Sequence, residues 1–259
     1  MDIATIVGIV VALVIVFVVQ ALEGGHAGSI LLLPAMLLVF GGALCAAMAG
    51  GVLKDTINLG KTLKKALLPK VTPPAELVNS IVKLAERARR EGLLALEDAV
   101  KTVDHPFLKR GLQLAIDGTD PEELHDILHA EVAAKKKADK AEMKILESMG
   151  GYAPTIGIIG TVMGLVHVLE NLDKPETLGH AIAAAFVATL WGVLSANVIF
   201  LPLASRLTRL SGIEAEEMEL AIEGVLAIQS GSNPRLVAQK LRSLLPPGAA
   251  EAADSKKAA

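Results

Sequence analysis

Two threonines within long apolar stretches are the residues of this sequence best suited to chemistry. Thr161 lies in YAPTIGIIGTVMGLVHVL and Thr189 in FVATLWGVLSANVIF, and neither stretch contains Asp, Glu, Lys or Arg. A hydroxyl in such surroundings either bonds to the carbonyl one helical turn earlier or contributes an oxygen to the path of an ion. Both interpretations of Thr161 stay open at this point, whereas Thr155 is interpreted as a structural hydrogen-bonding residue.

Small residues and prolines accompany these threonines. Three glycines follow the spacing G-x-x-G-x-x-x-G, which is typical of close packing between membrane helices: Gly157, Gly160 and Gly164. They are not a phosphate-binding loop, because no Lys-Ser/Thr pair follows them. Pro154 precedes Thr161 by two helical turns and shares its face. Pro154 and Pro202 each remove one backbone hydrogen bond, and we expect each to bend its helix.

The remaining reactive side chains do not form a catalytic pattern. His125 and His129 in HDILH share a helix face, but the metalloprotease pattern requires Glu in second place and a third ligand. His167 is expected to be an interfacial hydrogen-bonding group. Cys45 is the only cysteine, which excludes an internal disulfide and suggests a buried small hydrophobic residue. We therefore predict that the chain is not an enzyme and has no catalytic residue, metal or cofactor.

The composition favours a membrane protein. Mean hydropathy is +0.51, and 52% of residues are hydrophobic but only 3% aromatic, which is typical of lipid-embedded helices packed through small residues. Four stretches without charge reach the roughly 20 residues that cross a bilayer: Ile3–Leu22, Ala27–Leu53, Ser148–Leu169 and Thr177–Ser205. The predicted fold class is all-α, a polytopic membrane protein with four transmembrane helices in two hairpins and a helical cytoplasmic domain.

Charge distribution predicts the orientation of these spans. The short connections EGGHA and ENLDKPE hold one basic residue, Lys174, whereas lysines and arginines gather after span two, before span three and after span four. The positive-inside rule places both termini and residues 54–147 in the cytoplasm. The predicted parts are a hairpin at 1–53, a cytoplasmic domain at 54–147, a hairpin at 148–205, cytoplasmic helices at 206–245 and a disordered tail at 246–259. Nucleic acid is not expected as a partner, since no basic run is interleaved with aromatic residues.

Helix signals organise the cytoplasmic segments. PPAELVNSIVKLAERARR has an amphipathic period and ends at Gly92, and LLALEDAVKTV and PFLKRGLQLAI are predicted as shorter helices. Asp120 is predicted to cap the next helix, which nothing breaks before Gly150–Gly151 at the membrane. This helix is expected to stand about 40 Å into the cytoplasm and to feed directly into span three. Asn233 is predicted to cap a last short helix.

Taken together, these segments resemble the flagellar motor stator A subunits, the MotA family, called PomA in sodium-driven motors. The resemblance covers essentially the full length and is carried by MDIATIVGIV, ARREGLLALE, DHPFLKRGLQLAIDG, APTIGIIGTVMGLV, FVATLWGVLSANVIFLPLASRL and NPRLVAQKLRSLLP. It implies an inner-membrane complex in which a pentamer of this chain surrounds two MotB/PomB-like B subunits, each supplying a membrane Asp. Such a complex converts a H+ or Na+ gradient into rotation through contact with the flagellar rotor switch protein.

The resemblance also implies roles for residues. Thr161 and Thr189 match positions lining the ion path, and Pro154 and Pro202 match the two motor prolines. Three residues match the rotor-contacting region: Arg89, Arg90 and Glu97. Threonine at both lining positions favours Na+, because hydroxyl oxygens replace part of a sodium ion's hydration shell. Ala188, where sodium types often have a second threonine, departs from that pattern.

Two alternatives to a motor subunit are open. The energising subunit of a TolQ- or ExbB-like transport system shares the last two spans but usually has one N-terminal helix, so the hairpin at residues 3–53 argues against it. A passive membrane scaffold would use its small residues for helix assembly only. Removing the Thr189 hydroxyl tests the scaffold, which predicts no effect on ion flux beyond loss of assembly.

Overall fold

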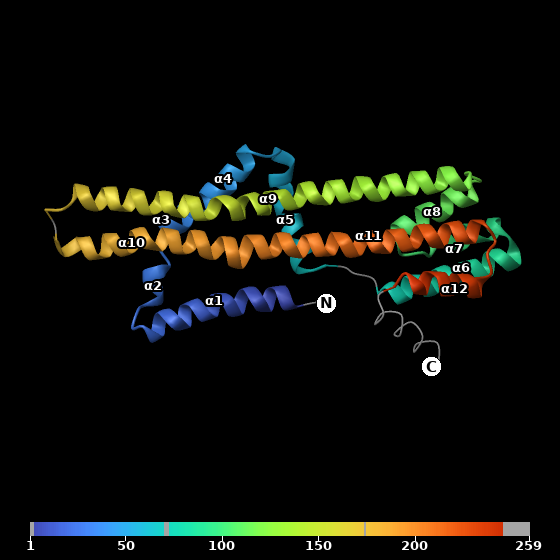
Figure 1. Cartoon of the computed structure of the whole chain (residues 1–259), viewed down its shortest axis with the longest axis horizontal. Helices are drawn as coiled ribbons and strands as arrows, with labels where there is room; N and C mark the ends of the chain where they lie inside the picture. The colour runs from blue at the N-terminus through green and yellow to red at the C-terminus, as the bar shows by residue number, and fades with distance from the viewer. Residues whose placement is uncertain (1–2, 70–72, 174, 246–259) are drawn as a thin grey trace. The chain divides into compact units, whose positions relative to one another are not determined.

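The computed structural model describes residues 3–69, 73–173 and 175–245, and every regular element within them is helical (Figure 1), which confirms the predicted fold class. The tail predicted at 246–259 lies outside the described residues. The chain divides into two compact units, each formed from two separate stretches. Met1–Pro69 with Asp139–Leu210 is called the membrane unit below, and Lys70–Ala138 with Ser211–Ala259 the second unit.

Four helical spans in the membrane unit are long and apolar enough to cross a bilayer, as predicted. The first is α1 (Ala4–Leu22), and the second consists of α2 (Ala27–Ile30), α3 (Leu33–Met36), the π-helix η1 (Leu37–Gly41) and α4 (Gly42–Ala49). The third is the apolar part of α9 (Pro121–Glu170), and the fourth is α10 (Pro175–Leu194), the π-helix η3 (Ser195–Phe200) and the start of α11 (Leu201–Gln229). Helix α5 (Leu53–Leu67) packs its apolar face on the same core.

The second span is broken, contrary to the continuous helix predicted from Ala27 to Leu53. The backbone leaves the helix at Leu31 and is extended at Leu32 (φ −89°, ψ 112°). Pro34 in the first turn of α3 explains the break. A proline in a continuous helix would lack its amide donor and clash with the carbonyl four residues earlier, that of Ile30.

Cys45 is exposed, so the prediction of a buried cysteine was wrong. The buried residues of α4 are Ala43 and Ala47, which share one face of the helix. Cys45 lies two residues from each and therefore about 200° around the helix. An apolar run in a membrane helix does not distinguish its lipid-facing side from its packed side, which is why composition could not locate Cys45.

Helix α9 is a single helix of 50 residues. The Asp120 carboxylate accepts from the Glu122 N–H at 2.9 Å, which confirms the predicted cap. The helix continues through Gly150–Gly151 directly into the third span, as predicted. Gly150 packs closely on the fourth span, since a Cβ there would lie 2.6 Å from Leu201 Cδ2.

The second unit has its own apolar core, enclosed by short helices and by parts of α9 and α11. Its elements are α6 (Pro74–Glu91), the 3-10 helix η2 (Leu93–Leu96), α7 (Glu97–Lys101), α8 (Pro106–Ile116) and α12 (Pro234–Ser243). Thus LLALEDAVKTV forms a 3-10 turn followed by a short α-helix. Asn233 caps α12 as predicted, accepting from the Arg235 N–H at 3.1 Å. Ile81 on α6 packs so closely on α11 that a Cβ at Gly224 would lie 2.6 Å from it.

Candidate functional site

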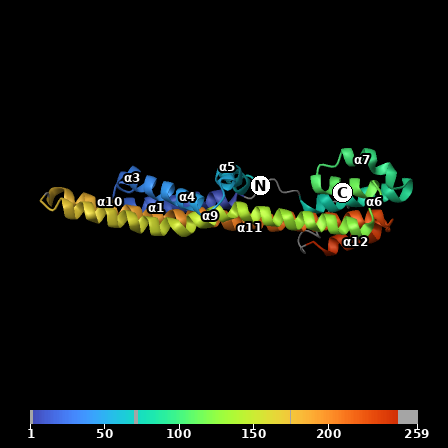
Figure 2. The ribbon, with the colours of Figure 1, turned by 90° about the horizontal axis from the view of Figure 1, so that it is seen from above.

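The candidate site in the membrane unit forms where α9 and α10 approach each other most closely. The two helices run side by side in both views (Figure 1, Figure 2). A Cβ on Gly157 would lie 2.8 Å from the Ala188 carbonyl oxygen, and one on Gly192 would lie 3.0 Å from Gly157 Cα. Gly160 faces Ala188 in the same way, and Gly164 faces Ala185. The three predicted glycines therefore lie against a matching row of small residues on α10 of the same chain.

This close approach brings Thr161 and Thr189 together. Their hydroxyl oxygens are 2.5 Å apart, and both side chains are half-buried. Thr161 Oγ1 is also 3.1 Å from the Ala185 carbonyl oxygen and 3.3 Å from that of Gly157, while Thr189 Oγ1 is 3.2 Å from the Gly157 oxygen. The hydrogen bond considered for Thr161, to the carbonyl one helical turn earlier, is thus present, and the Thr189 hydroxyl lies beside it. The Thr155 hydroxyl, by contrast, donates to the Tyr152 carbonyl of its own helix, at 2.8 Å.

The proton count of this pair limits its chemistry. Two hydroxyls carry two protons and four lone pairs; their mutual hydrogen bond uses one of each, and the second proton goes to a carbonyl. Three lone pairs remain as acceptors, and no proton remains for donation. The pair can therefore coordinate a cation or accept from a protonated acid. Holding a cation there would also require a negative charge, and the apolar stretches of this chain contain no Asp or Glu to supply one.

The two predicted prolines occupy different settings in these helices. Pro154 is half-buried in α9 on the side facing α10, since a Cβ on Gly192 would lie 3.3 Å from Pro154 Cα. Pro202 is the second residue of α11, separated from the end of the π-helix η3 by Leu201 alone. In a π-helix each backbone N–H bonds to the carbonyl five residues earlier instead of four, and a proline has no N–H to donate. The π-helix η3 before Pro202 therefore changes which backbone carbonyls of the fourth span lack a donor and alters the helical turn there.

Trp191 positions the second span against this site and was not singled out from the sequence. Its indole N–H donates to the Ile30 carbonyl at 2.6 Å, the carbonyl that Pro34 leaves without a helical donor. Trp191 is 5% exposed, and its ring lies 6.0 Å from that of Phe40. The N–H of a buried indole needs a hydrogen-bond acceptor. The single tryptophan of the sequence therefore could have predicted a hydrogen bond of this kind, although not its acceptor.

In the second unit, the three predicted contact residues lie exposed around the turn from α6 to α7. Arg89 and Arg90 occupy the last turn of α6, and Glu97 is the first residue of α7. Among the described residues none of them has an ion pair or a side-chain hydrogen bond. Charges beside them are paired within the chain: Arg87 with Glu91 at 3.1 Å and Lys101 with Asp98 at 2.8 Å.

An acidic side chain is buried in the second unit. Glu217 on α11 is 8% exposed, and within the described part of the chain its Oε1 has no hydrogen-bond partner. Burial, reinforced by the nearby Glu214 carboxylate and opposed by Lys135, raises the pKa of Glu217 to about 7. His105 Nε2 lies 3.9 Å from Glu217 Oε2, and its Nδ1 accepts from the Leu108 N–H at 3.2 Å to cap α8. Burial lowers the pKa of His105.

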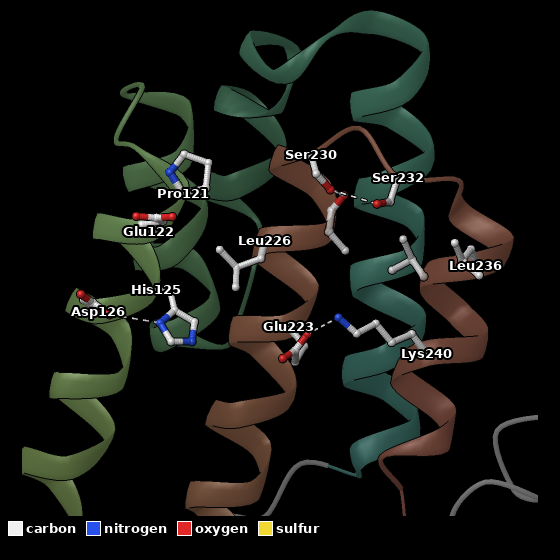
Figure 3. A pocket seen from close by; sticks show the side chains of 12 residues that line it. Pro121, Glu122, His125, Asp126, Glu223, Leu226, Ser230, Ser232, Leu236 and Lys240 are labelled. Atoms are coloured by element: carbon white, nitrogen blue, oxygen red, sulfur yellow. Dashed lines mark hydrogen bonds and ion pairs between the residues drawn. The ribbon is translucent and has the colours of Figure 1, made fainter.

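The predicted surface histidines lie beside a groove of the second unit (Figure 3). Its walls are the start of α9, the end of α11 and α12, and its volume is about 670 Å³. His125 lines the groove with Nδ1 3.2 Å from Asp126, and the Glu223–Lys240 ion pair crosses its far side. His129 lies 4.2 Å from His125, ring to ring, and 3.4 Å from Glu219.

Comparison with known proteins extends over nearly the whole chain. The MotA/TolQ/ExbB proton channel family matches residues 99–220, and the motility protein A N-terminal region matches residues 6–92. Motility protein A of Bacillus subtilis (strain 168) is 38% identical over 95% of this chain and 92% of the relative. Chemotaxis protein PomA of Vibrio alginolyticus is 32% identical over 96% of this chain and 97% of the relative.

Solved structures agree with these relatives. A chain of C. jejuni MotAB superimposes with a TM-score of 0.90 at 30% identity, covering 95% of this chain and 97% of that one. A chain of the flagellar MotAB stator complex from Bacillus subtilis gives a TM-score of 0.87 at 36% identity, with 94% and 96% covered.

Proposed function

The chain belongs to the MotA/TolQ/ExbB proton channel family, in its motility protein A branch, and we propose that it is the A subunit of a flagellar stator. Membership of this channel family confirms the prediction that the chain is not an enzyme. With a MotB/PomB-like B subunit it forms an ion-conducting complex that converts a H+ or Na+ gradient into rotation. The MotAB composition of both structural relatives supports this partner.

The observation that carries the proposal is the hydroxyl pair of Thr161 and Thr189, 2.5 Å apart on facing spans without an acid. Such a pair offers lone pairs to a cation or a protonated acid but lacks the carboxylate that ion translocation requires. A membrane Asp on the B subunit completes the path. We further propose that Na+ is the coupling ion, because two threonine oxygens replace part of its hydration shell.

The second unit then acts as the rotor-contacting part, in the cytoplasm together with both termini. Arg89, Arg90 and Glu97 contact the flagellar rotor switch protein through charges that are unpaired within the described part of the chain. Pro154 and Pro202 lie on the third and fourth spans, which line the ion path, and shape it. The complex resides in the inner membrane as a pentamer of this chain around two B subunits, without a resident cofactor.

The experiment is co-purification with the membrane protein encoded beside this chain, followed by native mass spectrometry. We expect five copies of this chain with two of the partner. Deleting the gene should abolish swimming while flagella remain assembled. A complex without a second chain, or swimming unchanged by the deletion, would contradict the proposal.

A further inference from the structure

The turn between α6 and α7 presents one large apolar side chain to solvent. The 3-10 helix η2 contains three leucines, and two of them serve the core: Leu96 is fully buried, and Leu93 packs against the buried cluster of the second unit. Leu94 is 71% exposed. Among the described residues of the second unit, only Leu236 and Leu244 are also large, apolar and exposed.

The backbone fixes Leu94 from both sides. Gly92 has φ +86°, a conformation that residues with a side chain rarely adopt, and its N–H donates to the Ala88 carbonyl at 2.8 Å. On the other side, the Glu97 N–H donates to the Leu94 carbonyl. Leu93 and Leu96 pack on the core on either side of Leu94. The turn therefore holds the Leu94 side chain in solvent.

The charges around Leu94 follow a fixed order along the chain. Two cations, Arg89 and Arg90, precede it at the end of α6, and one anion, Glu97, follows it at the start of α7. All three are exposed and, within the described residues, free of ion pairs, although adjacent charges are paired. The turn therefore has a cationic side, an apolar centre and an anionic side.

Charge alone is a poor basis for a contact that transmits force. Exposed ion pairs contribute little net affinity in water and are screened by salt, while they speed encounter and set register. A contact that persists under load requires surface area that is removed from water. Apolar side chains provide this buried area at the lowest desolvation cost. Leu94 is the side chain at this turn that can supply such area.

On the basis of the proposed rotor contact, we propose that Leu94 is the apolar anchor of this surface. The partner presents an apolar recess that receives Leu94, with an acidic group placed for Arg89 and Arg90 and a basic group placed for Glu97. Contact then buries the leucine and excludes water from the flanking ion pairs, which strengthens the Coulomb attraction within each pair.

The test uses the full-length chain, produced with its B subunit in cells lacking the native copy. Leu94→Gln removes the apolar character at similar size, Leu94→Met retains it, and Leu236→Gln makes the same change at the exposed leucine of the groove in Figure 3. We expect Leu94→Gln to lower stall torque about threefold or more. Leu94→Met and Leu236→Gln should stay near wild type, and co-purification with the B subunit should be unchanged in all three.

Equal torque in Leu94→Gln and Leu236→Gln would contradict the proposal that Leu94 is the apolar anchor. Equal loss of torque in Leu94→Gln and Leu94→Met would also contradict it. Loss of assembly in Leu94→Gln would also overturn it, because the leucine would then bind a second copy of this chain. Arg89→Glu separates the two levels of the proposal. If Arg89→Glu lowers torque and Leu94→Gln does not, the rotor contact stands and only the anchor fails; if neither does, both fail.

Discussion

Thr161 on α9 and Thr189 on α10 meet hydroxyl to hydroxyl, 2.5 Å apart, across a helix pair that approaches nearly backbone to backbone. Neither hydroxyl could reach the other if Gly157 and Gly192 carried side chains, because each Cβ would collide with the opposite helix. The small residues are therefore what bring the two hydroxyls together. Packing and ion chemistry, which the sequence left as alternatives, depend on the same residues here.

Arg89→Glu should reduce stall torque severalfold while leaving the complex intact. Arg89 is exposed and, in the part of the chain described, unpaired, so reversing its charge removes no internal contact but repels an acidic partner. Lys83→Glu makes the same charge change on the exposed side of α6 away from the turn and serves as the control. Torque measured on tethered cells checks this prediction, and normal torque from well-assembled Arg89→Glu stators would contradict it.

Swimming speed should follow the sodium gradient. If the hydroxyl pair coordinates Na+ beside the partner's carboxylate, the proton gradient is not the driving force. Speed should rise with external sodium and persist when a protonophore collapses the proton gradient at constant sodium. Arrest by the protonophore alone, with the sodium gradient intact, would instead identify H+ as the ion.

Trp191→Phe should destabilise the membrane unit. The Ile30 carbonyl would lose its indole donor in an apolar setting, at a cost of about 1–3 kcal/mol. Phe40→Leu is the control, since it removes the ring contact with Trp191 but keeps the hydrogen bond. Thermal unfolding of the detergent-purified complex should show a lower midpoint for Trp191→Phe than for Phe40→Leu; the reverse order would argue against this role of the indole.

Glu217→Gln should stabilise the chain at neutral and alkaline pH but not in acid. The pKa of Glu217 is about 7 in the folded chain against an ordinary 4.5, so between these values the unfolded chain has released a proton that the folded chain retains. Stability contributed by this group therefore falls as pH rises from 4.5 to about 7. His105, whose pKa is lowered by burial, contributes in the opposite sense as pH rises through its ordinary value of 6.5, and it is present in both proteins.

The comparison of variants isolates Glu217 from His105. At about pH 4, below the ordinary pKa of this carboxyl, Glu217→Gln and wild type should unfold alike, and at about pH 8 the variant should be more stable by about 1–2 kcal/mol. Glu216→Gln, an exposed acid on the same helix, should show no such change. The measurement is thermal unfolding of the purified complex at both pH values, and a pH-independent difference would exclude the buried carboxyl as its source.

The spans and most helix ends were predictable because they depend on local signals. Charge-free runs locate the four spans, and Asp120 and Asn233 cap helices through side chains adjacent in sequence. The break in the second span was predictable in principle from Pro34. Its stabilisation was not, because the donor to the Ile30 carbonyl comes from Trp191, 161 residues away.

Sequence pattern also could not separate exposed from buried acids on α11. Glu216 and Glu217 are adjacent in the acidic run EAEEMELAIE, yet Glu216 is exposed, whereas Glu217 is buried with 8% exposure. Which of them faces inward depends on how α11 is rotated against the start of α8, where His105 lies. Thr161 and Thr189 were each identified from the sequence, but their pairing depends on Gly192, whose partner Gly157 is on another helix.

The most direct test of the account is ion flux through the complex reconstituted in vesicles with its B subunit. Thr189→Val keeps the shape of the side chain and removes the hydroxyl, whereas Thr189→Ser keeps the hydroxyl. We predict that Thr189→Val lowers flux about tenfold or more in fully assembled complexes and that Thr189→Ser retains most of it. Wild-type flux through assembled Thr189→Val complexes would contradict the account and favour a passive packing role for the pair.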